Sequence, residues 1–85
     1  MEVKIHELKI HPRYFKDVML GIKKFEIRLN DRNYQERDIL FLNEYDPETK
    51  KHTGNSVKRR ITYVLHEAPG LMPGYVILQM EKLIL

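Results

Sequence analysis

Three charged residues, Lys23, Glu26 and Arg28, lie close together in the sequence. An arginine offers a planar fork of donors to a phosphate or a base edge, and a lysine offers a point charge. A glutamate beside them can hold the arginine in place or accept a hydrogen bond from an exocyclic amine. This combination suits the recognition of a phosphate or of a polar base. The same residues on an exposed strand can instead form an ordinary ion-pair ladder, worth less than about 1 kcal/mol per pair.

Residues 23–30 are expected to form the strand that carries these charges. Apolar and polar residues alternate along it, and a period of two is typical of a strand with one apolar and one polar face. Residues two apart on one face lie about 7 Å apart, so Glu26 and Arg28 would stand side by side. We expect this polar face to be solvated or to bind a polar ligand. The opposite face is expected to lie in the core and carries Phe25, Ile27 and Leu29.

Four further strands and one early helix are expected around this strand. Pro12 is placed to begin the helix, because proline is tolerated in the first helical turn, and Gly21 is placed to end it in the left-handed conformation. In the first strand the apolar residues change parity near His6, which indicates a bulge or a bend. The four strands are expected at residues 3–10, 39–44, 57–66 and 75–83.

The segment between the third and fourth strands is polar and holds two turn signals, Pro47 and Gly54. Residues 45–56 are therefore expected to form the tip of a long hairpin. The strand that follows alternates, with Ile61 and Tyr63 expected on the same face. Most aromatic residues are assigned to the core, namely Tyr14, Tyr45, Tyr63, Tyr75 and the three phenylalanines, with Tyr45 and Tyr75 as alternatives for stacking on a base.

The chain has 85 residues, which predicts a single domain over residues 1–85. The elements predict a mostly β (α+β) fold, a small barrel of about five strands, because closure removes exposed strand edges. The absence of cysteine excludes disulfides and thiolate metal sites. No apolar run approaches the roughly 20 residues of a membrane span, and the N-terminus lacks a signal-peptide pattern. We therefore expect a cytoplasmic protein without a membrane partner.

The net charge of +3, from 15 basic and 12 acidic residues, is too weak to indicate a nucleic-acid partner by itself. Basic residues gather at 23–24, 50–52 and 58–60, and two of these groups on one side of the fold would make a phosphate-binding face. The histidines lack the spacing of metal ligands, so no metal and no cofactor are expected. They are His6, His11, His52 and His66.

A family resemblance is carried by Gly21, Lys23, Glu26 and Arg28. Their Gly-x-Lys-x-x-Glu-x-Arg pattern resembles the signature of the ASCH domain (activating signal cointegrator homology), a relative of the PUA RNA-binding domain. Further segments are similar to a small, mostly bacterial and phage branch of that superfamily whose function is unknown. They are His6–Lys9, Pro12–Phe15, Asn30–Arg32, Thr53–Gly54 and Pro73–Val76, and in this order they cover nearly the whole chain.

The resemblance implies a PUA-like β-barrel with the early helix packed over one end and a cleft beside it. The signature residues would line that cleft and bind RNA or a nucleotide-like piece of it. Lys9 is expected to face the cleft, because the first strand should lie next to it. Asn30 and Arg32 either add a base-reading amide and positive charge or belong to an ordinary turn. The expected binding residues, in a protein expected to be a monomer, are Lys9, Lys23, Glu26, Arg28, Asn30 and Arg32.

Two other functions stay open at this point. Some ASCH relatives are small hydrolases of an acetylated cytidine that use a lysine followed by a nucleophilic threonine. Lys23 matches that lysine, but Glu26 fills the threonine position, so the mechanism does not carry over and an enzyme would have to use Glu26 as a base on water. Other relatives are ribonucleases. The third possibility is a protein-interaction module that uses Lys50, Lys51 and the hairpin tip. The sequence names neither the RNA nor the modified base.

Overall fold

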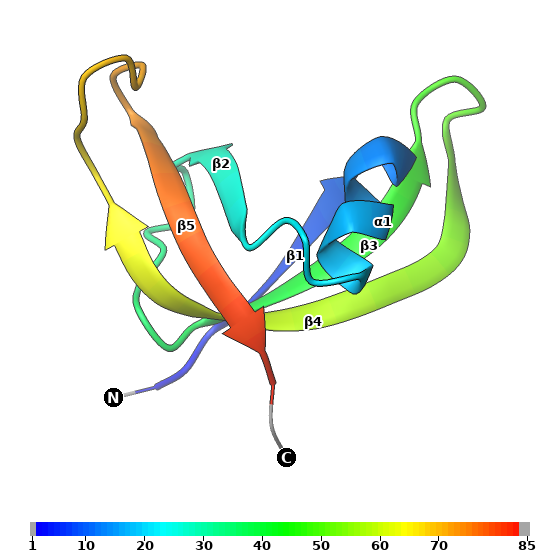
Figure 1. Cartoon of the computed structure of the whole chain (residues 1–85), viewed down its shortest axis with the longest axis horizontal. Coiled ribbons are helices and arrows are strands. Elements are labelled where there is room, and N and C mark those ends of the chain that lie inside the picture. Colours follow the sequence, from blue (N-terminus) through cyan, green and yellow to red (C-terminus); the bar gives the residue numbers. More distant parts are fainter. Residues whose placement is uncertain (1, 84–85) are drawn as a thin grey trace.

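The computed structural model describes residues 2–83, which form a curled five-stranded sheet and one short helix (Figure 1). The strand order is β1-β3-β4-β5-β2, with β1 and β3 parallel and the other pairs antiparallel. The sheet therefore forms a half-barrel with β1 and β2 at its two edges. The predicted mostly β class, with five strands and an early helix, is confirmed. The elements are β1 (Ile5–Ile10), α1 (Pro12–Met19), β2 (Phe25–Leu29), β3 (Ile39–Asp46), β4 (Lys51–Leu65) and β5 (Tyr75–Lys82).

The hydrophobic core fills the inside of the curl. α1 contributes Phe15 and Val18, and the strands contribute Leu8, Ile10, Leu40, Leu42, Ile61, Val76, Leu78 and Met80. A buried cation also ties α1 to the sheet: Nη2 of Arg59 in β4 donates to the carbonyl oxygen of Val18 at 3.0 Å. Burial lowers the pKa of the Arg59 guanidinium. The hydrogen bond to the Val18 carbonyl offsets part of the cost of burying this charge.

Helix α1 begins and ends as predicted. Pro12 is its first residue, and Gly21 follows the C-cap with φ of +76°. The N–H of Gly21 donates to the carbonyl of Val18 at 3.0 Å, and the N–H of Ile22 donates to that of Asp17 at 2.9 Å. This pair of bonds is the Schellman motif, which satisfies the last carbonyls of a helix. Within residues 2–83, no helix is long and apolar enough to cross a membrane.

Gly21→Ala is expected to lower the free energy of unfolding by about 1 kcal/mol, because an L side chain is disfavoured at positive φ. A Cβ added there would meet nothing within 4 Å, so the cost is one of backbone conformation alone. Urea unfolding followed by circular dichroism measures the change. Leu20→Ala is the matched control, since Leu20 is exposed and has φ of −79°. Equal losses in the two variants would contradict the assignment.

The bulge expected near His6 is absent, because the parallel register of β1 with β3 runs without interruption from Ile5 to Ile10. His6 takes an inward position on the same face as Leu8, while Ile5 is exposed. The prediction was wrong because the change of parity rested on Val3 and Ile5, which are apolar but exposed, whereas the inward position belongs to His6. Its ring is buried and donates to Asp38, so it occupies a core position without an unpaired donor.

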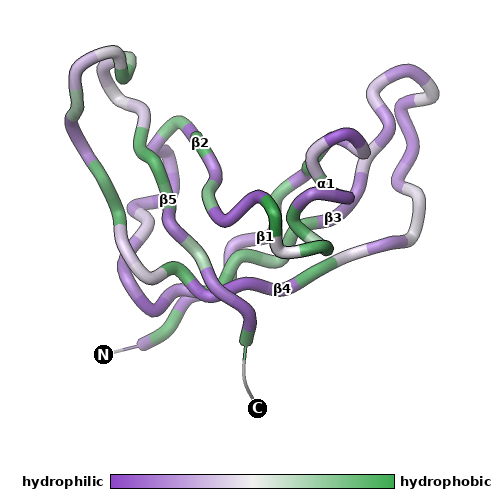
Figure 2. Tube along the Cα trace, viewed as in Figure 1, coloured by the Kyte–Doolittle hydropathy of each residue, from purple (hydrophilic) through white to green (hydrophobic). Residues whose placement is uncertain are grey.

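The hairpin of β3 and β4 is longer in its strands and shorter in its tip than predicted. The turn covers only residues 47–50, and residues 51–56 belong to β4. Most residues of this distal part are exposed and hydrophilic (Figure 2). Nearer the core, a register shift between Ile61 and Tyr63 turns Tyr63 outward and brings Val64 against the core. The predicted common face of Ile61 and Tyr63 was therefore wrong, because a bulge reverses the parity.

The largest fully buried side chain is Tyr34, which is 1% exposed and lies in the irregular segment 30–38. Sequence periodicity gave no reason to place it in the core. Among the aromatic residues that were assigned there, Phe15 is buried, whereas Tyr14, Phe25 and Tyr63 are exposed. Aromatic type alone was therefore a poor guide to burial in this chain.

Candidate functional site

The charged residues of β2 point into the half-barrel, and its apolar residues point out. Glu26 is paired with Leu78 of β5 and Arg28 with Val76, both of which are core residues. Directly opposed residues share a face of the sheet, so Glu26 and Arg28 project to the core side. The expected burial of the apolar face of this strand was therefore wrong, and the exposed residues are Phe25, Ile27 and Leu29.

Glu26 is 5% exposed and is the centre of a compact ion cluster. Its Oε1 accepts from Nζ of Lys23 at 2.5 Å, and its Oε2 accepts from Nε and Nη2 of Arg28 at 3.0 and 2.9 Å. Nζ of Lys23 also donates to the carbonyl of Phe25 at 2.6 Å. We call the three charged residues the Lys23–Glu26–Arg28 cluster. One buried carboxylate thus fixes two cations, which leaves the cluster with one net positive charge.

Two arginines reach across from the β2 side to the open edge of β1. Nη2 of Arg28 donates to the carbonyl of Lys9 at 2.7 Å, and Nη1 of Arg32 donates to the carbonyl of Glu7 at 3.0 Å. β1 and β2 are the two edges of the sheet and do not pair with each other. We call the line where these edges meet the seam. The arginine side chains satisfy edge carbonyls there that a neighbouring strand would otherwise bind.

A hollow of about 510 Å³ opens at the seam beside the start of α1. This seam hollow is within the usual size range of small-molecule sites. Its charged lining consists of Lys9 and the Lys23–Glu26–Arg28 cluster, and its aromatic lining consists of Tyr14 and Phe25. Four of the six predicted site residues therefore meet in one place, although they come from two strands and the loop before β2.

Two exposed aromatic rings flank Lys23 in this hollow. Tyr14 and Phe25 are 41% and 45% exposed. Nζ of Lys23 lies 5.4 Å from the ring centroid of Tyr14 and 4.7 Å from that of Phe25. These distances are typical of cation–π contacts, which help to hold the ammonium between the rings. Neither ring was singled out from the sequence, because both were assigned to the core.

The other two predicted residues have different positions. Arg32 lines an adjoining hollow, together with Lys9 and Arg28. Asn30 lines neither hollow, and its Oδ1 accepts from the backbone N–H of Tyr34 at 3.1 Å. Asn30 therefore closes the local loop, as expected for the turn alternative. Asp31 is exposed, and its Oδ1 lies 3.9 Å from Nε of Arg32.

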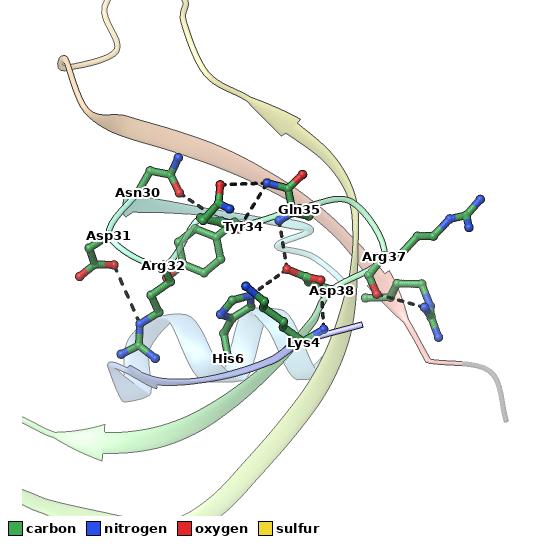
Figure 3. A network of polar contacts seen from close by, with 11 residues as sticks. Lys4, His6, Asn30, Asp31, Arg32, Tyr34, Gln35, Arg37 and Asp38 are labelled. Atoms are coloured by element: carbon green, nitrogen blue, oxygen red, sulfur yellow. Dashed lines mark hydrogen bonds and ion pairs between the residues drawn. The ribbon is translucent and has the colours of Figure 1, made fainter. Parts of the chain in front are cut away.

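A second polar network holds the segment 30–38 against β1 (Figure 3). Oδ1 of Asp38 accepts from the N–H of Lys4 at 3.2 Å, and its Oδ2 accepts from Nε2 of His6 at 2.9 Å and the N–H of Gln35 at 3.1 Å. The His6 ring packs edge-on against Tyr34, with centroids 4.7 Å apart. The network fixes the segment that carries Arg32. Neither Asp38 nor Tyr34 was predicted from the sequence to belong to such a network.

Burial and hydrogen bonding act in opposite directions on Asp38. Burial alone would raise the pKa of its carboxyl group, but the hydrogen bonds from His6, Lys4 and Gln35 outweigh burial and lower the pKa below its usual value of 3.8. For Tyr34 burial dominates and raises the pKa, although Arg32 and Arg28 act against it. Asp38 is therefore a firmly ionised acceptor. Within residues 2–83, no group of three or more His, Asp or Glu side chains is placed to hold a metal ion.

The half-barrel, its seam and its charged hollow define a small β domain with a polar cleft between two sheet edges. Residues 5–80 match the family model described as a domain of unknown function, DUF3850, so the chain belongs to that family. It is also 45% identical over 64 residues to an uncharacterized 12.9 kDa protein encoded in the GpA 3′ region of Escherichia phage P2. That match covers 75% of this chain and 57% of the phage protein, so the chain spans little more than half of the relative's length.

Proposed function

We propose that this protein binds RNA, or a nucleotide-like piece of it, in the seam hollow. The observation that carries the proposal is the Lys23–Glu26–Arg28 cluster, in which a buried carboxylate orients two cations beside exposed aromatic rings. Proteins that bind single-stranded nucleic acid combine such positive charge with rings on which bases stack. The resemblance of the same residues to the ASCH signature, and through it to PUA RNA-binding domains, supports the proposal.

Different residues of the seam hollow are suited to a phosphate and to a base. Lys9 and Lys23 are the groups suited to a phosphate, because an ammonium is a compact point charge on a flexible stem. Arg28 already uses Nε and Nη2 in bonds to Glu26 and Lys9, so Nη1 is the donor that it can offer to a ligand. A base stacked on Tyr14 or Phe25 would add about 1–3 kcal/mol.

The same geometry argues against Glu26 as a general base. Both of its carboxylate oxygens are engaged by cations, so a proton arriving on either oxygen would displace a partner. A catalytic base needs an oxygen that can reach a water or a substrate proton. We therefore propose binding rather than turnover.

Lys23→Ala is expected to weaken the binding of a short fluorescein-labelled single-stranded RNA about tenfold in an anisotropy titration, a loss of about 1.4 kcal/mol. A plot of the logarithm of the affinity against the logarithm of the salt concentration should have a negative slope of about 0.7 per phosphate contact. The slope for Lys23→Ala should be smaller in magnitude than that for the wild type. Arg28→Ala should weaken binding similarly, with some loss of stability from the opened seam.

Lys24→Ala is the matched control, because Lys24 neighbours Lys23 and carries the same charge but does not line the seam hollow. It should bind nearly as the wild type does. Equal damage in the two lysine variants would show that binding follows overall charge and would refute the proposed site. Conversion of the RNA or of an acetylated cytidine by the wild type would identify an enzyme instead.

A further inference from the structure

Two further hollows adjoin the seam hollow along β1 and β3. A neighbouring hollow of about 440 Å³ shares Lys9 and Arg28 with it. A further hollow of about 430 Å³ shares Glu7, Asn43 and His52 with that neighbour. Because successive hollows share side chains in their linings, they lie next to one another along the sheet. We call these two added hollows the outer path, which leads from the seam to the β3–β4 hairpin.

Strand register sets out the floor of the outer path. Lys9 lies on the outer face of β1, and the register pairs it with Asn43 of β3. Asn43 is paired in turn with Ser56 of β4, so these three residues form a row across three strands. Tyr45 and His52 form the next pair toward the turn of the hairpin. A polar row beside an aromatic pair is therefore built into the sheet rather than into a loop.

Two contacts between a cation and an aromatic ring lie beside the outer path, and Lys9 and Phe41 are their members that line its hollows. Nζ of Lys9 lies 4.3 Å from the ring centroid of Tyr45, and the His52 ring contacts the same tyrosine with centroids 5.1 Å apart. Nζ of Lys58 lies 5.3 Å from the ring centroid of Phe41. Such rings with a positive group above them suit a base and its phosphate together. The chemistry of the seam hollow is thus repeated along the sheet.

The hairpin that bounds the far end of the outer path is held in place by side chains. Oε1 of Glu44 accepts from Oγ1 of Thr53 at 2.7 Å and from Nδ2 of Asn55 at 3.1 Å. Gly54, between them, lines the last hollow, and a Cβ added to it would meet nothing within 4 Å. A ligand can therefore approach the backbone closely at this point. The wall is already formed and needs no ordering on binding.

We infer that the ligand is a single RNA strand several nucleotides long, which enters at the seam hollow and follows the outer path to the hairpin. This inference rests on the proposed function and adds the length and the course of the ligand. An OB fold, another small β domain, covers about 4–16 nucleotides of a single strand. Lys9 stands at the centre of the course, because it lines both the seam hollow and the next one.

One group in the outer path opposes the ligand. Glu7 lines both outer hollows, and its exposed carboxylate would repel a phosphate that passes there. Glu7→Gln is therefore expected to strengthen the binding of a strand that fills the path about threefold to tenfold at low salt, by the Coulomb repulsion removed. It should leave a dinucleotide that fills only the seam hollow unaffected.

The test is an anisotropy titration of oligouridylates that run from a dinucleotide to about 8 nucleotides. Wild-type affinity is expected to rise steeply with length and to level off once the path is filled. The double variant His52→Ala, Asn55→Ala should lose about tenfold for the long strands and nothing for the dinucleotide. The double variant Lys50→Ala, Lys51→Ala is the control, since Lys50 ends the hairpin turn and Lys51 begins β4, and neither lines the hollows. Circular dichroism confirms that each variant is folded.

The outcomes separate this inference from the function on which it rests. If no length binds, the proposed function falls, and the inference falls with it. If the dinucleotide binds as tightly as the long strands and the His52 variant is unchanged, the seam hollow stands and the outer path is refuted. A loss of long-strand binding that the tip variant shares equally would also refute the path, because it would show unspecific attraction to the hairpin.

Discussion

Asp38→Ala is expected to lower the free energy of unfolding by about 3 kcal/mol, because it leaves the buried His6 ring and two partly buried backbone N–H groups without an acceptor. The Asp38 side chain is 3% exposed and accepts from His6 and from the backbone of Lys4 and Gln35. Hydrogen bonds to a charged group are worth about 1.5–3 kcal/mol each, and an unpaired buried donor costs about 1–3 kcal/mol. A loss of this size is a large fraction of the stability of a small domain.

Urea unfolding followed by circular dichroism measures this loss. Asp38→Asn is the matched control, since it keeps the shape and one acceptor oxygen but removes the charge, and it should lie between wild type and Asp38→Ala. A change below about 0.5 kcal/mol in the alanine variant, the usual range for surface substitutions, would show that the network does not hold the segment 30–38.

The same carboxyl group makes stability depend on pH. Its pKa in the folded protein is lower than the usual 3.8, so the folded state binds its proton less readily than the unfolded state does. The contribution of Asp38 is therefore fully present above the unfolded pKa and is lost as pH falls through the folded pKa. Stability should decline less steeply below pH 4 in Asp38→Asn than in the wild type. Parallel acid profiles for the two proteins would contradict this linkage.

Glu26→Ala is expected to cost about 2–3 kcal/mol of stability, because it leaves two partly buried cations side by side without a counter-charge. The side chains of Lys23 and Arg28 are only 16% and 24% exposed, so solvent cannot fully replace the lost carboxylate. Thermal and urea unfolding measure the loss. Glu26→Gln, which retains one acceptor oxygen, should lose less. A loss under about 1 kcal/mol would instead place Glu26 in an ordinary surface ladder.

The sequence predicted the elements of this fold well, because their signals are local. Pro12 and Gly21 mark the ends of α1 through the backbone angles that each residue favours, and alternation marks β2 as a strand. Alternation does not say which face is buried, however. Glu26 could be placed inside only because Lys23 and Arg28 neutralise it there, and a three-dimensional partnership of this kind has no period in the sequence.

The segment 30–38 and the distal hairpin were harder to predict for two different reasons. His6 and Lys4, which donate to Asp38, lie 32 and 34 positions away from it in the chain. Only Gln35 is a near neighbour, so the local sequence does not signal the role of Asp38. In residues 51–56 every side chain is exposed, so no apolar alternation separates strand from turn. The family resemblance predicted the charged residues that line the seam hollow. It did not predict that Tyr14 and Phe25 line the same hollow.

The order of strands in the sheet has a consequence for how the molecule assembles. β3, β4 and β5 follow one another in the chain and pair as a meander, so their contacts form with little loop-closure entropy. β1 and β2 are close in sequence but lie at opposite edges, and each needs that meander as a template. We therefore expect the N-terminal third to dock after the meander has formed. Since this third builds most of the seam hollow, we expect the hollow to form late and to be among the first parts lost in a partial unfolding event.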